Sequence, residues 1–122
     1  MNDEKKKKEL FQEGLRQYKL MDYYESHEVW EELWSDYYLK DKKFIQGLIQ
    51  LSVSFVHLGN GNMIGANNLL KKSKEKFIQF SGIHRGIDIS ILLDEIENVE
   101  LEYKQLKNPN NFQWDLVPKL EQ

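Results

Sequence analysis

The sequence predicts an all-α protein, a single-domain bundle of about five helices with a docked C-terminal tail. Its two prolines, Pro109 and Pro118, lie close to the C-terminal end, so neither interrupts a helix in the preceding part of the chain. There the apolar residues recur at the spacing of an α-helix. The length of 122 residues is that of one ordinary domain with one core. We therefore expect one domain over residues 1–122.

Five helices can be placed from their caps, their turns and their apolar positions. Asp22, Asn62 and Asp88 carry side chains that cap helix N-termini, and they precede the second, fourth and fifth helices. A glycine-rich turn around Asn60 ends the third helix, and an Asn-Pro turn at Asn108 ends the fifth. The expected helices cover residues 4–20, 22–39, 43–58, 62–80 and 88–106.

The same patterns indicate how the helices pack. The first two helices are joined by a very short link, so they should be antiparallel neighbours. The helix over residues 43–58 is apolar almost all round and should be the most buried. The tail carries Phe112, Trp114 and Leu116, three apolar side chains that we expect to dock on the bundle. The inner face of the first helix is expected to hold Leu10, Phe11, Leu15 and Tyr18.

Composition limits the classes of function. A net charge of −3 and a pI near 5.6 argue against a general nucleic-acid binder, and the one basic run, residues 5–8, is short. No apolar stretch approaches the roughly 20 residues that cross a bilayer, so no membrane insertion is expected. The absence of cysteine excludes disulfides and thiolate zinc sites, and with no leader peptide in the sequence it fits the cytoplasm. We expect a monomer or a homodimer.

Residues 22–39 contain the first half of a candidate site. His27, Glu31 and Trp34 are spaced so that they stack on one helix face. A histidine and a carboxylate on a face that should be buried require partners, because ionisable groups rarely enter a core unpaired. The same stripe holds Tyr23, Trp30 and Tyr38. The opposite face holds Glu25, Glu28, Glu32 and Asp36.

The third helix supplies the second half of this site. Gln46, Gln50 and His57 form a polar stripe on an otherwise apolar helix, with Val53 filling the gap in the row. Each of these groups would cost about 1 to 3 kcal/mol if it were buried without a partner. If the second and third helices are antiparallel neighbours, the stripe can face His27 on the second helix. The sequence therefore predicts a buried polar cluster made of His27, Glu31, Gln46, Gln50 and His57.

Three hypotheses explain such a cluster. It can be a structural hydrogen-bond network that Trp30 and Trp34 seal from water. It can be a site for one divalent metal, zinc or iron, with His27, Glu31 and His57 as ligands and an open position. It can also be a small pocket in which Glu31 and His27 act as catalytic acid and base on a ligand stacked against Trp34.

Known metal motifs do not match these residues. A ferritin-like di-iron bundle requires inward carboxylates that the third helix lacks, and the zincin motif H-E-x-x-H is absent. The residues considered for a ligand pocket or a structural network are Trp34, Gln46, Gln50, Trp30 and Asn60.

Six separated motifs resemble the family known as domain of unknown function 309, and they cover residues 23–88. They are H-E-V-W-E-E-L-W at 27–34, Q-G-L-I-Q at 46–50, His57, Gly59-Asn60, Gly65-Ala66 and Gly86-Ile87-Asp88. The resemblance implies a small all-helical domain and no established activity. It implies a family signature made of His27, Glu31, Trp34, Gln46, Gln50 and His57.

Two functions of different class follow from these patterns. The first is a metal or small-ligand pocket between the second and third helices, with or without catalysis. The alternative is a non-enzymatic interaction module in which the cluster is structural and a surface near Trp114 or residues 5–8 meets a protein partner. Glu31→Ala separates them, since it should cost more than about 2 kcal/mol if the cluster is structural and little if it is functional.

Overall fold

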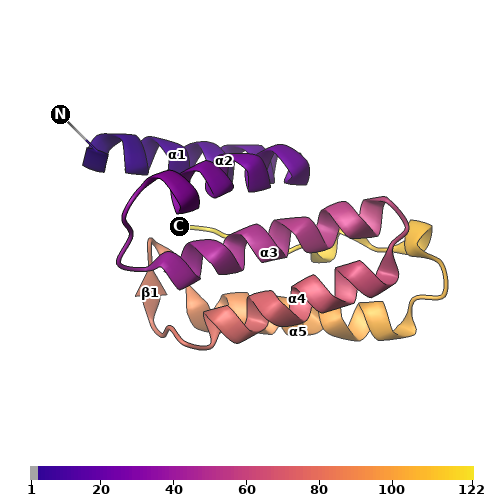
Figure 1. Cartoon of the computed structure of the whole chain (residues 1–122). Coiled ribbons are helices and arrows are strands. Elements are labelled where there is room, and N and C mark those ends of the chain that lie inside the picture. Colours follow the sequence, from indigo (N-terminus) through magenta and orange to yellow (C-terminus); the bar gives the residue numbers. More distant parts are fainter. Residues whose placement is uncertain (1–2) are drawn as a thin grey trace.

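The computed structural model describes residues 3–122 (Figure 1). The all-α class and the five helices are confirmed. Between the last two helices lies a short antiparallel hairpin, and two 3-10 turns lie in the tail. The helices are α1 (Asp3–Lys19), α2 (Tyr23–Asp36), α3 (Lys42–Gly59), α4 (Met63–Phe77) and α5 (Ile89–Gln105). The remaining elements are β1 (Ile83–His84), β2 (Ile87–Asp88), η1 (Pro109–Asn111) and η2 (Trp114–Leu116).

The helix α3 occupies the centre of the fold. Figure 1 shows α1 and α2 on one side of it and α4 and α5 on the other. The extensive contacts are those of α1 with α2, of α2 with α3 and of α3 with α4. The fully buried aromatic core residues include Trp30, Phe44, Phe55 and Phe77. As the apolar composition of residues 43–58 predicts, α3 supplies the largest share of the buried residues.

The predicted N-caps are confirmed, because each cap side chain accepts a hydrogen bond from the first turn of its helix. Asp22 accepts from the amide of Glu25 at 3.0 Å, and Asn62 accepts from the amide of Gly65 at 2.9 Å. Asp88 caps α5 in the same way at 3.2 Å. Short polar side chains in the sequence therefore set where three of the five helices begin.

The helix α2 is shorter than its periodicity predicts. It ends at Asp36, because Tyr37 adopts an extended backbone. Beyond it Leu39 enters the core, while Tyr38 is 76% exposed. Tyr38 is therefore not part of the aromatic stripe. Leu39, which was expected to be the last residue of this helix, instead anchors the link to α3 in the core.

The loop expected after the fourth helix contains the hairpin. Ile83 pairs with Asp88 and His84 with Ile87, and Arg85 and Gly86 make the turn with φ of 49° and 80°. Two consecutive residues with positive φ are typical of the tight turns that suit the twist of a hairpin. The hairpin holds His84 and Arg85 against the α2–α3 link.

The tail docks on the bundle, as the three apolar residues of its sequence predict. Phe112, Val117 and Leu120 are buried, and the Tyr18 hydroxyl donates to the Pro118 carbonyl oxygen at 2.7 Å. The Trp114 ring stacks on the Tyr23 ring with centroids 5.9 Å apart. The tail is therefore a structural part of the domain.

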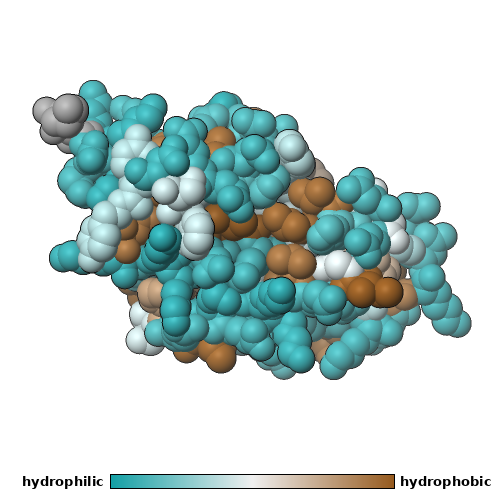
Figure 2. All heavy atoms as spheres, viewed as in Figure 1, coloured by the Kyte–Doolittle hydropathy of each residue, from teal (hydrophilic) through white to brown (hydrophobic). Residues whose placement is uncertain are grey.

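Hydrophilic residues cover most of the face shown in Figure 2, and apolar residues appear in a band across its middle, where α3 lies in Figure 1. Within residues 3–122, no helix is long and apolar enough to cross a membrane.

Candidate functional site

Four of the predicted site residues line one pocket. Glu31 and Trp34 reach it from α2, and Gln46 and Gln50 reach it from α3. The pocket has a volume of about 240 Å³. Its apolar wall consists of Ile49, Val53 and Leu69. Helical spacing thus placed these four residues on facing surfaces of α2 and α3, whereas His27 and His57, which were expected with them, do not line the pocket.

Two buried polar atoms of this pocket have no hydrogen-bond partner among the described residues. They are Nε1 of Trp34, a donor, and Oε1 of Gln50, an acceptor. Leaving such a group unpaired costs about 1 to 3 kcal/mol, and most proteins avoid it. Two residues that line the pocket, Trp34 and Gln50, therefore each contain a buried polar group that no described residue pairs.

One charged side chain contacts Trp34 and another lines the pocket. The Lys42 ammonium lies 4.3 Å from the centroid of the Trp34 ring, in a cation–π contact. Glu31 is exposed, and its carboxylate makes no hydrogen bond within residues 3–122. The expectation that Glu31 is buried is therefore wrong. The pocket opens to solvent, so this carboxylate keeps its hydration.

His27 lies on α2 one turn before Glu31, but it does not line the pocket. Its Nδ1 donates to the Tyr24 carbonyl oxygen at 2.6 Å, and its Nε2 lies 3.4 Å from a Glu28 carboxylate oxygen. The ring also contacts the Tyr24 ring edge-on. His27 is thus held by its own helix and makes no contact with Glu31 through a hydrogen bond.

His57 lies at the far end of α3, where it faces the start of α4. Its Nδ1 is 3.4 Å from Nδ2 of Asn62, and a Cβ added at Gly65 would come within 2.8 Å of its Cγ. Glycine at position 65 therefore leaves room for the imidazole. This observation gives Gly65 a specific role in the close approach of α3 and α4.

The register of α2 against α3 explains why His57 is remote from Glu31. Ser26 and Ser52 face each other, with 2.9 Å between their hydroxyl oxygens. From this pair Glu31 is displaced by five residues toward the end of α2, and His57 by five residues toward the end of α3. Because the helices are antiparallel, the two displacements add to about 15 Å along the axes.

The metal hypothesis for His27, Glu31 and His57 receives no support from this arrangement. Within residues 3–122, no group of three or more His, Cys, Asp or Glu side chains could hold a metal ion.

Trp30, another predicted site residue, does not line the pocket. Its indole is fully buried against α1, where Nε1 donates to the Phe11 carbonyl oxygen at 3.2 Å.

Serines make several of the buried side-chain hydrogen bonds between helices. Ser26 bonds Ser52 across α2 and α3, and Ser54 donates to the Ala66 carbonyl oxygen of α4 at 2.7 Å. Ser54 also lies 3.0 Å from the Tyr103 hydroxyl of α5. The serines of α3 were not among the predicted site residues. The signal for their role was the presence of two serines in the most apolar helix.

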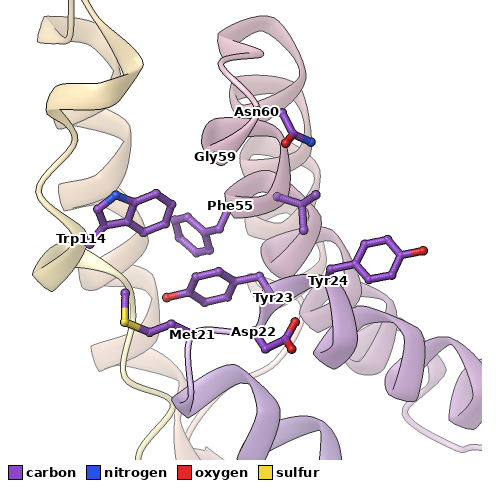
Figure 3. Close-up of a pocket in the computed structure, with 9 residues that line it drawn as sticks. Met21, Asp22, Tyr23, Tyr24, Phe55, Gly59, Asn60 and Trp114 are labelled. Atoms are coloured by element: carbon purple, nitrogen blue, oxygen red, sulfur yellow. The ribbon is translucent and has the colours of Figure 1, made fainter.

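A second pocket, of about 390 Å³, lies where α2 begins and α3 ends. Figure 3 shows Tyr23, Phe55 and Trp114 gathered on one side of it and Asn60 at its edge. The Tyr23 and Phe55 ring centroids are 5.3 Å apart, and burial raises the pKa of Tyr23 to about 12. Asn60, a predicted site residue, therefore lies on a different pocket from Glu31.

Fold and site together define a small helical domain with a polar pocket between two antiparallel helices. Residues 11–69 match the family described as domain of unknown function (DUF309). The resemblance to this family that the motifs predicted is therefore confirmed over these residues. The match begins within α1 and stops before the hairpin, whereas the motifs spanned residues 23–88. All seven residues that line the 240 Å³ pocket lie within the matched residues 11–69.

Two curated relatives are similar to this chain, and both carry only general names. "Uncharacterized protein YpuF" of Bacillus subtilis (strain 168) is 32% identical over 103 residues, which are 80% of this chain and 56% of that protein. An "Uncharacterized protein" of Aquifex aeolicus (strain VF5) is 26% identical over 109 residues, 88% of this chain and 32% of that protein. The chain thus spans about half of the first relative and about a third of the second. No solved structure matches it significantly.

Proposed function

We propose that the pocket between α2 and α3 binds a small polar ligand. The observation that carries this proposal is that two residues lining one pocket each have a buried atom without a partner among the described residues, Nε1 of Trp34 and Oε1 of Gln50. A fold that only needed stability would gain from apolar side chains at these positions, because each unpaired group is costly. Binding sites commonly retain such groups at the expense of stability.

The two atoms specify the chemistry of the ligand. Trp34 requires an acceptor and Gln50 requires a donor, so a group that carries both, such as a primary amide, is complementary. The wall of Ile49, Val53 and Leu69 favours an apolar remainder. The volume of about 240 Å³ corresponds to about eight water molecules. The ligand is therefore small, or it is one side chain of a larger molecule.

The geometry fits ligand binding better than it fits catalysis in which two residues act as acid and base. Glu31 lies on the pocket and can exchange a proton with a ligand. His27 is held by the Tyr24 carbonyl oxygen and does not line the pocket, so none of residues 3–122 accompanies Glu31 there as a second proton-transfer group. The proposal therefore assigns Glu31 to the rim of a binding pocket.

The structural alternative requires hydrogen bonds between the side chains of the cluster. Within the described part of the chain, none joins His27, Glu31, Gln46, Gln50 or His57 to another member. The serine bonds between the helices already provide a buried polar contact that fixes their register. This comparison favours the ligand pocket over a structural network.

The proposal can be tested by nuclear magnetic resonance with acetamide as the probe. Acetamide has a donor and an acceptor, whereas N,N-dimethylacetamide keeps the acceptor and lacks the N–H groups. We expect acetamide to shift the Trp34 indole N–H resonance saturably and the dimethyl compound to shift it much less. Trp30, whose N–H is already bonded to Phe11, provides an internal reference.

Two variants complete the test. Trp34→Phe removes the indole N–H and Gln50→Leu removes the carbonyl, so each should weaken acetamide binding about tenfold, the effect of one lost hydrogen bond. Gln12→Leu, at an exposed position of α1, should leave binding unchanged. Equal responses to both amides, or an unchanged acetamide affinity in Gln50→Leu, would contradict the proposal.

A further inference from the structure

A groove of about 650 Å³ lies at the end of the molecule where α1 begins. The α2–α3 link and the hairpin also contribute to it, and Figure 1 shows these segments at the same end of the bundle as the start of α1. Its basic side chains are Lys7, Lys8, Lys40 and Arg85. This groove is separate from the pocket of the proposed function, with which it shares no lining residue.

Positive charge is concentrated around this groove. Residues 3–9, 38–43 and 83–85 together contain eight lysines and arginines and four acidic residues. The whole chain contains 17 basic and 20 acidic residues, so the rest of the chain carries nine basic and sixteen acidic residues. An acidic protein thus has one basic end. Such asymmetry steers the approach of oppositely charged partners.

Some of the cations at the groove are fixed by the fold. Arg85 forms a two-point contact with the Asp41 carboxylate, and its guanidinium lies 4.7 Å from the centroid of the Phe11 ring. Lys7 donates to the Glu4 carboxylate at 3.0 Å. These contacts hold the walls of the groove in place, and they neutralise two of its positive charges.

Two other lysines on the lining remain available. Lys8 and Lys40 form no hydrogen bond or ion pair with any described residue. Both nevertheless act on a carboxylate of this chain: the pKa of Glu4 is lowered, chiefly by the hydrogen bond and charge of Lys7 and to a smaller extent by Lys8 and Lys40. Glu4, which lines the groove with these lysines, is thus paired directly by Lys7 alone among the described residues.

Tyr38 adds an aromatic contact surface to these charges. It lines the groove, 76% of it is exposed, and the Lys7 ammonium lies 6.0 Å from its ring centroid. An exposed tyrosine beside lysines is unnecessary for folding. Tyrosine is enriched among the residues that dominate protein interfaces.

We propose that this groove binds a short acidic segment of another protein, with Lys8 and Lys40 pairing its carboxylates and Tyr38 packing against its backbone and side chains. A long phosphate polymer fits less well. The exposed acidic face of α2 ends at Asp36, two residues before Tyr38, and the groove itself contains Glu4 and Asp41. The positive region is therefore short, and screening over about 8 Å keeps its influence local.

The experiment uses the full chain and a fluorescein-labelled hexaglutamate peptide, followed by fluorescence anisotropy. Lys8→Glu combined with Lys40→Glu should weaken binding by about tenfold or more, because two attractive pairs become repulsive. The matched control is Lys71→Glu with Lys72→Glu on α4, where both lysines are exposed and outside the groove. It makes the same change in net charge and should alter the affinity by less than about twofold.

Further arms decide between this proposal and other occupants. Tyr38→Ser should weaken hexaglutamate binding about threefold or more, since it removes the aromatic contact without changing the charge. Equal losses in the groove and control variants would overturn the proposal, as they would indicate a general effect of charge. Tighter binding of a labelled hexathymidylate would assign the groove to nucleic acid. Self-association in sedimentation experiments that the groove variant abolishes would assign it to a second copy of the chain.

Discussion

Gly14→Ala tests the packing of α1 on α2 at its tightest point. Gly14 is buried, and a Cβ added there would lie 2.1 Å from Nε1 of Trp30 and 2.4 Å from its Cδ1. Real Cβ atoms are not found so close to another side chain. The indole therefore lies flat against the backbone of α1, and only glycine permits this contact.

The expected cost follows from what must move. The ring would have to shift by more than about 1 Å, but Trp30 is fully buried and its ring contacts those of Phe11 and Tyr18. Overpacking of this kind costs about 1 to 3 kcal/mol, and the bond from the indole to the Phe11 carbonyl contributes about 1 kcal/mol more if it breaks. Alanine regains about 1 kcal/mol of helix propensity. We expect a net loss of about 2 kcal/mol.

Urea denaturation followed by circular dichroism measures this loss directly. The matched control is Gly59→Ala, because Gly59 also lies in a helix and nothing is within 4 Å of its added Cβ. That variant should be neutral or up to about 1 kcal/mol more stable. In a double-mutant cycle, Trp30→Phe should reduce the cost of Gly14→Ala, since the smaller ring leaves space. If both glycine variants have the same stability, the close packing of Trp30 on α1 is refuted.

Three further substitutions test the site and the hairpin contact by chemical denaturation. Gln50→Leu should stabilise the ligand-free protein by about 1 kcal/mol or more, because it removes an unpaired buried carbonyl, and a clear loss of stability would contradict the pocket assignment. Glu31→Ala should change stability by less than about 0.5 kcal/mol, since the carboxylate is exposed and makes no hydrogen bond within residues 3–122; a cost above about 2 kcal/mol would favour a structural network. Asp41→Asn should cost about 2 kcal/mol at neutral pH. Burial opposes ionisation of Asp41, but hydrogen bonds and charge from Arg85 and His84 outweigh it and lower its pKa. A lowered pKa means that the stability contributed by the charged form is present at neutral pH and is lost as the pH falls below about 4, where the difference from Asp41→Asn should shrink.

Local chemistry explains why much of the secondary structure could be predicted. Asp22, Asn62 and Asp88 cap their helices through contacts with residues three positions away, so the relevant geometry is contained in the sequence. The hairpin escaped prediction because its strands have only two residues each, too few to show an alternating pattern.

The helix faces of four site residues could also be predicted, because the face depends only on the helical period. That is why Glu31, Trp34, Gln46 and Gln50 share a pocket in the structure. Trp30, by contrast, was placed on the same broad stripe, but its indole packs against Gly14 of α1. A wide apolar stripe can contact two neighbouring helices, and the sequence does not assign each residue to one of them.

The sequence by itself determined the helices, their caps, the docked tail and the face on which the polar residues lie, since all of these depend on short-range spacing and apolar content. Only the tertiary structure decided the axial register of α2 against α3, which the Ser26 and Ser52 contact displays. Register depends on side-chain packing between segments far apart in the chain, so helical periodicity carries no information about it. That register keeps His57 away from Glu31 and leaves Trp34 and Gln50 with two unused polar atoms in one pocket.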